Sequence, residues 1–126
     1  MFSNLKIRAL LLSLTFLFLF SGSVYGEEWK DGLDAANKGD YKTAFSLWKP
    51  LAEQGNAKAQ YNLGVMYGTG QGVPQDYKEA VKWYTKSAEQ GGADAQYNLA
   101  LKYDNGQGVL QDYKEAVKWY RLSAEQ

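Results

Sequence analysis

Apolar and small side chains recur with helical spacing over residues 57–126. In the first periodic stretch, one helix face would carry residues at i, i+3, i+4 and i+7: Gln60, Leu63, Gly64 and Tyr67. The sequence GTGQGV then interrupts the pattern, because a glycine in a helix interior costs ~1 kcal/mol. A second periodic stretch follows Asp76, so the pattern predicts two helices joined by a glycine-dependent turn.

The same pattern, followed along the chain, predicts an all-α protein. Asp76 can accept hydrogen bonds at the start of the second helix, and Glu79 three residues later would complete a capping box. Asp112 and Glu115 repeat this arrangement. The expected helices cover residues 28–38, 40–53, 57–68, 76–90, 93–104 and 112–125.

These helices belong to an internal repeat with a period of 36 residues. Residues 57–90 and 93–126 are identical at 25 of 34 aligned positions, and a weaker copy precedes them. A single helical hairpin cannot bury its apolar face alone, so repeated hairpins stack into a solenoid. The sequence predicts three hairpins, with helices brought close by a small residue at one position of each: Gly32, Gly64 and Ala100.

Composition narrows the chemistry that such a chain can carry. Of 126 residues none is cysteine or histidine, and 14 basic residues balance 14 acidic ones. The chain therefore lacks disulfides, a thiol nucleophile, and the commonest general base and metal ligand. An even charge balance gives no electrostatic signature of nucleic-acid binding. We expect no enzymatic activity, no cofactor, no metal site and no nucleic-acid partner.

Residues 1–26 have the features of a secretory signal peptide. Two basic residues precede an uncharged apolar run over residues 9–20, and Val24 and Gly26 fit the −3 and −1 cleavage positions. This run is shorter than the ~20 residues that span a bilayer, so a retained membrane anchor is the less favoured alternative. Cleavage would leave residues 27–126 with a net charge of 12 − 14 = −2 and no membrane span. The mature protein is expected in the periplasm or outside the cell.

One long motif runs through residues 57–91: A-x-A-Q-Y-N-L-G-x-x-Y-x-x-G-x-G-V-x-Q-D-Y-x-x-A-x-x-W-Y-x-x-x-A-E-Q-G. Residues 93–126 repeat it up to the final glutamine, with Ala100 in place of Gly64. The motif resembles the Sel-1-like repeat family, whereas the first unit, with NKGDYKTA and a turn four residues shorter, looks more like a tetratricopeptide hairpin. The resemblance implies a right-handed α/α solenoid that presents a concave surface to protein or peptide partners. Exported bacterial members are associated with envelope processes and host contact. The implied units are residues 27–56, 57–92 and 93–126.

In solenoids of this kind the first helix of each hairpin lines the concave face. Three columns align there: aromatic Trp29, Tyr61 and Tyr97; polar Lys30, Asn62 and Asn98; apolar Leu33, Val65 and Leu101. An aromatic ring offers a large contact area at low entropic cost, and an asparagine amide can both donate to and accept from a peptide backbone. We expect these residues to bind an extended segment of a partner. The alternative is that the tyrosine and leucine columns pack between adjacent hairpins.

Other patterns in the chain suggest chemistry more weakly. Ser46 and Lys49 fit the S-x-x-K pattern of penicillin-recognising enzymes, but no S-D-N or K-T-G element accompanies them. The glycine-rich turns lack the strand and lysine of a phosphate-binding loop, and Asp104 lacks the further ligands of a calcium site. Basic residues at helical spacing predict a solvated face, with an acidic partner as the alternative: Lys78, Lys82, Lys86, Lys114, Lys118 and Arg121.

The favoured interpretation is an exported protein–protein interaction module. The alternatives are a β-lactam-binding or β-lactamase-type activity, which some secreted relatives of the family imply, and a structural fragment of a longer repeat array. The third hairpin is not followed by a polar capping helix in this sequence. We therefore expect Trp119, Tyr120 and Leu122 to be partly uncovered, and a partner or self-association to cover them.

Overall fold

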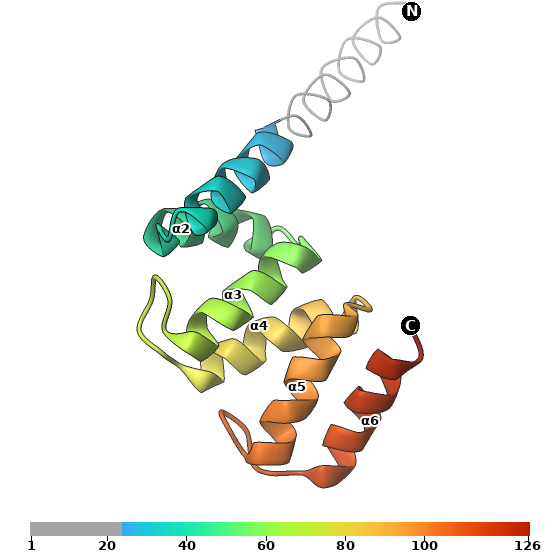
Figure 1. The fold of residues 1–126 in the computed structure, drawn as a ribbon. Coiled ribbons are helices and arrows are strands. Elements are labelled where there is room, and N and C mark those ends of the chain that lie inside the picture. Colours follow the sequence, from blue (N-terminus) through green and yellow to red (C-terminus); the bar gives the residue numbers. More distant parts are fainter. Residues whose placement is uncertain (1–23) are drawn as a thin grey trace, which may run out of the picture.

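Helices make up most of the chain that the computed structural model describes, residues 24–126 (Figure 1). Within this range there are six helices and no strands, which confirms the predicted all-α fold class. The first helix covers residues 24–37, and it is followed by α2 (Tyr41–Glu53), α3 (Ala57–Thr69), α4 (Tyr77–Glu89), α5 (Ala93–Asn105) and α6 (Tyr113–Ala124). The predicted signal peptide lies outside the described residues, apart from its last three positions.

The predicted helix boundaries agree with the structure to within one residue from α2 to α6. The first helix differs, because residues 24–27 are already helical and the prediction began at residue 28. The sequence around Gly26 looked like a turn, but a glycine can continue a helix where its φ stays negative, and Gly26 is not among the glycines with positive φ. The last positions before the predicted cleavage site are therefore helical.

An aspartate caps α4, as predicted. Asp76 Oδ1 accepts hydrogen bonds from the backbone N–H groups of Lys78 and Glu79 at 3.0 and 3.2 Å. The N–H of Asp76 itself donates to the Tyr67 carbonyl at 2.9 Å. The Glu79 side chain is therefore not needed to satisfy that N–H, and it pairs with Lys82 at 3.5 Å. The predicted N-cap at Asp76 is confirmed, but the predicted return bond from the Glu79 side chain is wrong. In α6, Asp112 caps the helix in the same way and Glu115 pairs with Lys118.

Consecutive helices pack together, so the chain forms three hairpins stacked in sequence order (Figure 1). The two hydrophobic clusters each extend across a hairpin boundary. The first reaches from Ala35 in the first helix to Trp83 in α4, and the second reaches from Ala80 in α4 to Trp119 in α6. Because each hairpin completes its core with its neighbour, the fold is the expected α/α solenoid.

An aromatic ring from the second helix of a hairpin fills the space that a glycine leaves in the first helix. A methyl group at Gly64 would lie 2.5 Å from Tyr84 Cδ1, and one at Gly32 would overlap the Trp48 ring. The small residues were expected to bring two helix backbones together. In the structure Gly32 and Gly64 make room for the rings of Trp48 and Tyr84, and each of these residues is only 4% exposed.

The glycine-rich loops after α3 and α5 pack on the hairpin that precedes them. Gly72 has φ +76°, and a methyl group there would lie 2.5 Å from the Tyr41 carbonyl oxygen. Gly108 has φ +77° and approaches the Tyr77 carbonyl in the same way. Both the left-handed backbone and the close approach require glycine. The loops thus have a structural role in joining neighbouring hairpins.

Buried glutamines add polar links between hairpins. Gln60 in α3 donates from Nε2 to the Ala52 carbonyl of α2 at 3.0 Å. Its Oε1 accepts a hydrogen bond from Gln90 Nε2 at 2.8 Å. Gln96 and Gln126 repeat this pairing one hairpin later at 2.7 Å. Each glutamine in the A-x-A-Q motif is therefore a buried polar group with its partners in place.

Candidate partner-binding site

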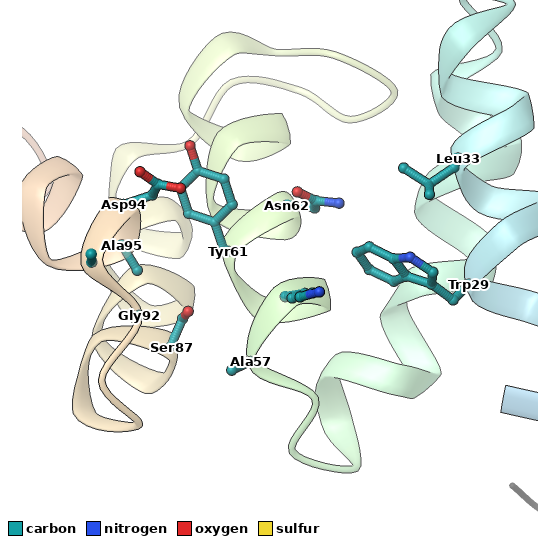
Figure 2. Close-up of a pocket in the computed structure, with 11 residues that line it drawn as sticks. Trp29, Leu33, Ala57, Tyr61, Asn62, Ser87, Gly92, Asp94 and Ala95 are labelled. Atoms are coloured by element: carbon teal, nitrogen blue, oxygen red, sulfur yellow. The ribbon is translucent and has the colours of Figure 1, made fainter. Parts of the chain in front are cut away.

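An open pocket crosses α3, between the first helix on one side and the start of α5 on the other (Figure 2). Its volume is about 350 Å³, which is at the lower end of the ~300–1,000 Å³ range of ligand pockets. All three hairpins contribute to it, mainly through their first helices, and α4 adds a single residue, Ser87. The stacking of the hairpins therefore creates this site.

Two aromatic side chains lie on opposite sides of α3 in the pocket. Trp29 faces it from the first helix, and Tyr61 points from α3 toward α5 (Figure 2). Each ring rests on a ring from the second helix of its hairpin: Trp29 stacks on Trp48 at a centroid distance of 5.4 Å, and Tyr61 packs on Tyr84 at 6.0 Å. Packing on the second helix of each hairpin thus fixes the positions of the Trp29 and Tyr61 rings in the pocket.

The Tyr61 hydroxyl is held by a neighbouring hairpin. Asn98 Nδ2 from α5 donates a hydrogen bond to the Tyr61 hydroxyl oxygen at 3.4 Å. Burial raises the pKa of Tyr61, and the negative charge of Asp94 raises it further. The hydroxyl therefore stays protonated at neutral pH, and its own hydrogen can be donated into the pocket.

The start of α5 differs from the start of α3. Asn56 caps α3 by accepting a hydrogen bond from the Ala59 N–H at 2.9 Å, whereas the N-cap of α5 is Gly92, which makes no side-chain cap bond. Ser87 is 2% exposed, and Figure 2 shows its hydroxyl pointing toward the space beside this turn. A methyl group at position 92 would lie 2.9 Å from Ser87 Oγ, so the glycine leaves room for the hydroxyl.

Four of the nine residues predicted for partner binding line this pocket: Trp29, Leu33, Tyr61 and Asn62. The other five lie outside it. Lys30 is exposed, Val65 packs against the second hydrophobic cluster, and Leu101 is half-buried. Tyr97 is 51% exposed beside Tyr120, at a centroid distance of 5.5 Å, and Asn98 contributes through its bond to Tyr61.

Sequence reasoning missed the part of the pocket near α5. These lining residues are Ala57 and Lys58 at the start of α3, Ser87 in α4, and Gly92 to Ala95. Alignment of the first helices could not find Ser87, because it belongs to a second helix. The available signal was the change from Asn56 to Gly92 at equivalent positions, which removes a helix cap.

The residues considered for other chemistry have structural partners. Ser46 Oγ donates to the Lys42 carbonyl at 2.8 Å, and Lys49 pairs with Glu53 at 3.6 Å. Among the basic residues at helical spacing, Lys82 and Lys86 place their amines 5.0 and 5.2 Å from the centre of the Trp83 ring.

Over residues 24–126, no helix is long and apolar enough to cross a membrane. The same part of the chain holds no group of three or more acidic, histidine or cysteine side chains suited to a metal ion.

Stacked helical hairpins with a groove across their first helices define an α/α solenoid repeat protein. The profile of the Sel1 repeat matches residues 26–56, 57–92 and 93–126. The chain therefore belongs to the Sel1 repeat family, which confirms the resemblance seen in the sequence. The match includes the first hairpin, in spite of its shorter turn. A comparison with curated protein sequences gave no match.

Solved structures with the same repeat are similar to this chain. A Sel1 repeat protein from Oxalobacter formigenes is 40% identical, with a TM-score of 0.74, over 78% of this chain and 40% of its own. The protein c5321, a protective antigen of uropathogenic Escherichia coli strains with an SLR fold, is 42% identical, with a TM-score of 0.76, over 81% of this chain and 23% of its own. This chain thus spans less than half the length of either protein.

A more distant structure shares the fold. Helicobacter pylori cysteine rich protein B is 19% identical, with a TM-score of 0.64, over 80% of this chain and 86% of its own. At this identity the similarity concerns the arrangement of helices.

Proposed function

We propose that this protein is a non-catalytic interaction module that binds an extended segment of a protein partner across its first helices. The observation that carries the proposal is the pocket over α3, to which all three hairpins contribute. An extended segment lying across α3 would contact Trp29 at one end and Tyr61 at the other. Sel1 repeat proteins typically mediate contacts between proteins, which agrees with a site of this kind.

The Asn62 side chain is central to this proposal. It lies on α3 between the two aromatic residues, and its amide points toward Leu33 (Figure 2). An amide in this place can donate to a main-chain carbonyl and accept from a main-chain N–H of the same bound segment. Asn98 supports the site in a different way, by holding the Tyr61 hydroxyl.

Photo-cross-linking followed by affinity measurement tests the proposal. A photoreactive phenylalanine analogue at Leu33 should cross-link a partner in bacterial cells, whereas the same analogue at Lys78, an exposed residue of α4, should not. The identified partner should then bind the Asn62→Ala/Asn98→Ala variant at least ten-fold more weakly. Asn37→Ala, at an exposed asparagine, is the matched control. Unchanged affinity of the double variant would contradict the proposal.

Export is part of the proposed function. The basic start, apolar run and small residues of positions 1–26 support processing by a signal peptidase. The E. coli relative is described as a protective antigen, which agrees with exposure to a host. The mass of the protein recovered from a periplasmic or culture-medium fraction should correspond to residues 27–126. Recovery of the unprocessed chain from the cytoplasm would contradict export.

The exposed face of α6 supports a second proposal, that two copies of the chain self-associate there. The expectation that Trp119 is partly uncovered is wrong, because it is 9% exposed within the second hydrophobic cluster, whereas Leu122 is 38% exposed. Tyr113 is 63% exposed and Val117 is 54% exposed, whereas Val81, the equivalent of Val117 in α4, is 8% exposed. The α4 face is covered by the third hairpin, whose Gly108 loop lies on Tyr77. A second copy covering α6 would remove comparable apolar surface from water.

Analytical ultracentrifugation over a range of protein concentrations tests self-association. The weight-average mass should rise with concentration and fall to that of a monomer in Val117→Glu. Lys114→Glu, at an exposed position of the same helix, should behave like the unmodified chain. A monomer at every concentration would sink this second proposal.

A further inference from the structure

The first turn of α5 offers hydrogen-bond donors to the pocket. The first N–H groups of any helix have no partner within the helix, and a side-chain cap usually satisfies one of them. The N-cap Gly92 makes no such bond, while residues 92–95 line the pocket. At the start of α3 the equivalent donor, the Ala59 N–H, is already bonded to the Asn56 side chain.

Ser87 is a second and independent polar feature of the same place. Only 2% of its surface is exposed, yet its hydroxyl lies at the wall of the pocket (Figure 2). The equivalent Ser123 donates to the Ala93 carbonyl at 2.9 Å, and no such bond joins Ser87 to another described residue. A buried hydroxyl aimed into a pocket is suited to meet an oxygen acceptor there.

The charges around the pocket decide which acceptor fits. Lys58 and Asp94 both line it, so the formal charges of its lining cancel. Asp94 belongs to the same first turn of α5, and its negative charge would repel a carboxylate bound there. A neutral carbonyl avoids this repulsion, and the neighbouring main-chain N–H of a peptide can donate to the Asp94 carboxylate.

The other side of α3 suits an apolar side chain. Leu33 and Trp29 from the first helix face the pocket there, with Asn62 between them and the α5 side. A bulky aliphatic or aromatic side chain would bury apolar surface against both, and Asn62 would bond the main chain in passing. The groove therefore joins an apolar anchor to a carbonyl site.

We infer that the first turn of α5 and the Ser87 hydroxyl bind a main-chain carbonyl of the partner, and that this partner presents an uncharged, extended segment with a bulky apolar side chain. The inference rests on the proposed function, because it names the chemistry recognised by the same groove. It adds Ser87 and Gly92, neither of which the binding columns of the first helices contain.

Short synthetic peptides of defined charge test this inference. The probes are fluorescein-labelled seven-residue peptides with acetylated and amidated ends, glycine and serine flanks, and a central Leu, Trp, Glu or Lys. Fluorescence polarisation with the full chain should give tighter binding for Leu and Trp than for Glu and Lys. Ser87→Ala and Gly92→Asn should each weaken the Leu or Trp peptide roughly three- to ten-fold, the value of about one neutral hydrogen bond.

Thr85→Val is the matched control. It also removes a hydroxyl from α4, but Thr85 Oγ1 donates to the Val81 carbonyl of its own helix, so affinity should not change. Equal affinity of Ser87→Ala, Gly92→Asn and the unmodified chain overturns the inference, as does the failure of every capped peptide to bind. Tighter binding of a peptide with a free C-terminal carboxylate overturns the assignment of a neutral carbonyl.

The two proposals can fail separately. A cross-linked partner whose affinity falls in Asn62→Ala but not in Ser87→Ala would leave the proposed function standing and overturn this inference. A partner whose affinity changes in neither variant would contradict both the proposed function and this inference.

Discussion

The Tyr84 ring lies so close to Gly64 that a methyl group at position 64 would be 2.5 Å from Tyr84 Cδ1. Gly64→Ala should therefore destabilise the fold by about 1–3 kcal/mol, because a buried ring must move, even though alanine favours a helix. Urea unfolding followed by circular dichroism measures the change.

Gly68 in the same helix is the control for this prediction. A methyl group there would lie 3.7 Å from the Tyr84 hydroxyl, which is an ordinary contact. Gly68→Ala should stabilise the protein by up to about 1 kcal/mol through helix propensity. If both alanines are stabilising, the contact between Gly64 and Tyr84 does not limit this position.

Gly108 carries a second prediction, which concerns the loop after α5. Its φ is +77°, and an added methyl group would overlap the backbone carbonyl of Tyr77. Gly91 has φ +92° with nothing within 4 Å of an added methyl group. Gly91→Ala should cost about 1–2 kcal/mol from backbone strain, and Gly108→Ala should cost clearly more. Equal costs in thermal unfolding would mean that the loop does not need its contact with α4.

Gln90 provides a test of the polar links between hairpins. Its Nε2 donates to Gln60 Oε1 at 2.8 Å and to the Gly55 carbonyl at 3.0 Å. Gln90→Ala should destabilise the fold by about 1–3 kcal/mol, because the buried Gln60 loses its donor. Gln54, the exposed equivalent in the first hairpin, serves as the control, and Gln54→Ala should change the free energy of unfolding by less than about 0.5 kcal/mol.

Stability should fall at alkaline pH. Burial raises the pKa of Tyr84 above its usual value of 10.0, and the neighbouring Tyr61 raises it further. The unfolded chain therefore loses this proton first, so stability is fully present below about pH 10 and decreases as pH rises from there toward the folded-state pKa. Urea midpoints between pH 8 and pH 11 should decline, and less steeply in Tyr84→Phe. An identical decline in that variant would contradict the assignment.

Ser46 should not support β-lactam hydrolysis. Its hydroxyl donates to the Lys42 carbonyl, and Lys49 is paired with Glu53, so neither group is directed at the other. We expect the purified protein to give no turnover of nitrocefin. Turnover that disappears in Ser46→Ala would instead establish the enzymatic alternative.

The helices of this chain could be predicted because their signals are local. Asp76 at a helix start and glycine after a helix end act through the backbone of a few neighbouring residues, so their effect is readable from the sequence. The start of the first helix was missed for the same reason, since Gly26 looks like a turn residue and only its negative φ shows that the helix continues through it.

The candidate site was predictable only in part, because it is formed by stacking. Aligning the repeats identified Trp29 and Tyr61, which occupy one column of the first helices. It could not identify Ser87, which reaches the pocket from α4, or show that Asn98 is engaged with Tyr61. Such relationships depend on how far one hairpin is rotated on the next, which the 36-residue period does not specify.

The loops that carry Gly72 and Gly108 both reach backward along the chain, to Tyr41 and Tyr77. The loops of the second and third hairpins therefore pack on a hairpin that was synthesised earlier, and neither loop contact waits for a later segment. A chain that emerges from the ribosome or an export channel with its N-terminus first can fold one hairpin at a time. The direction of the loop contacts thus matches the direction in which the protein is made.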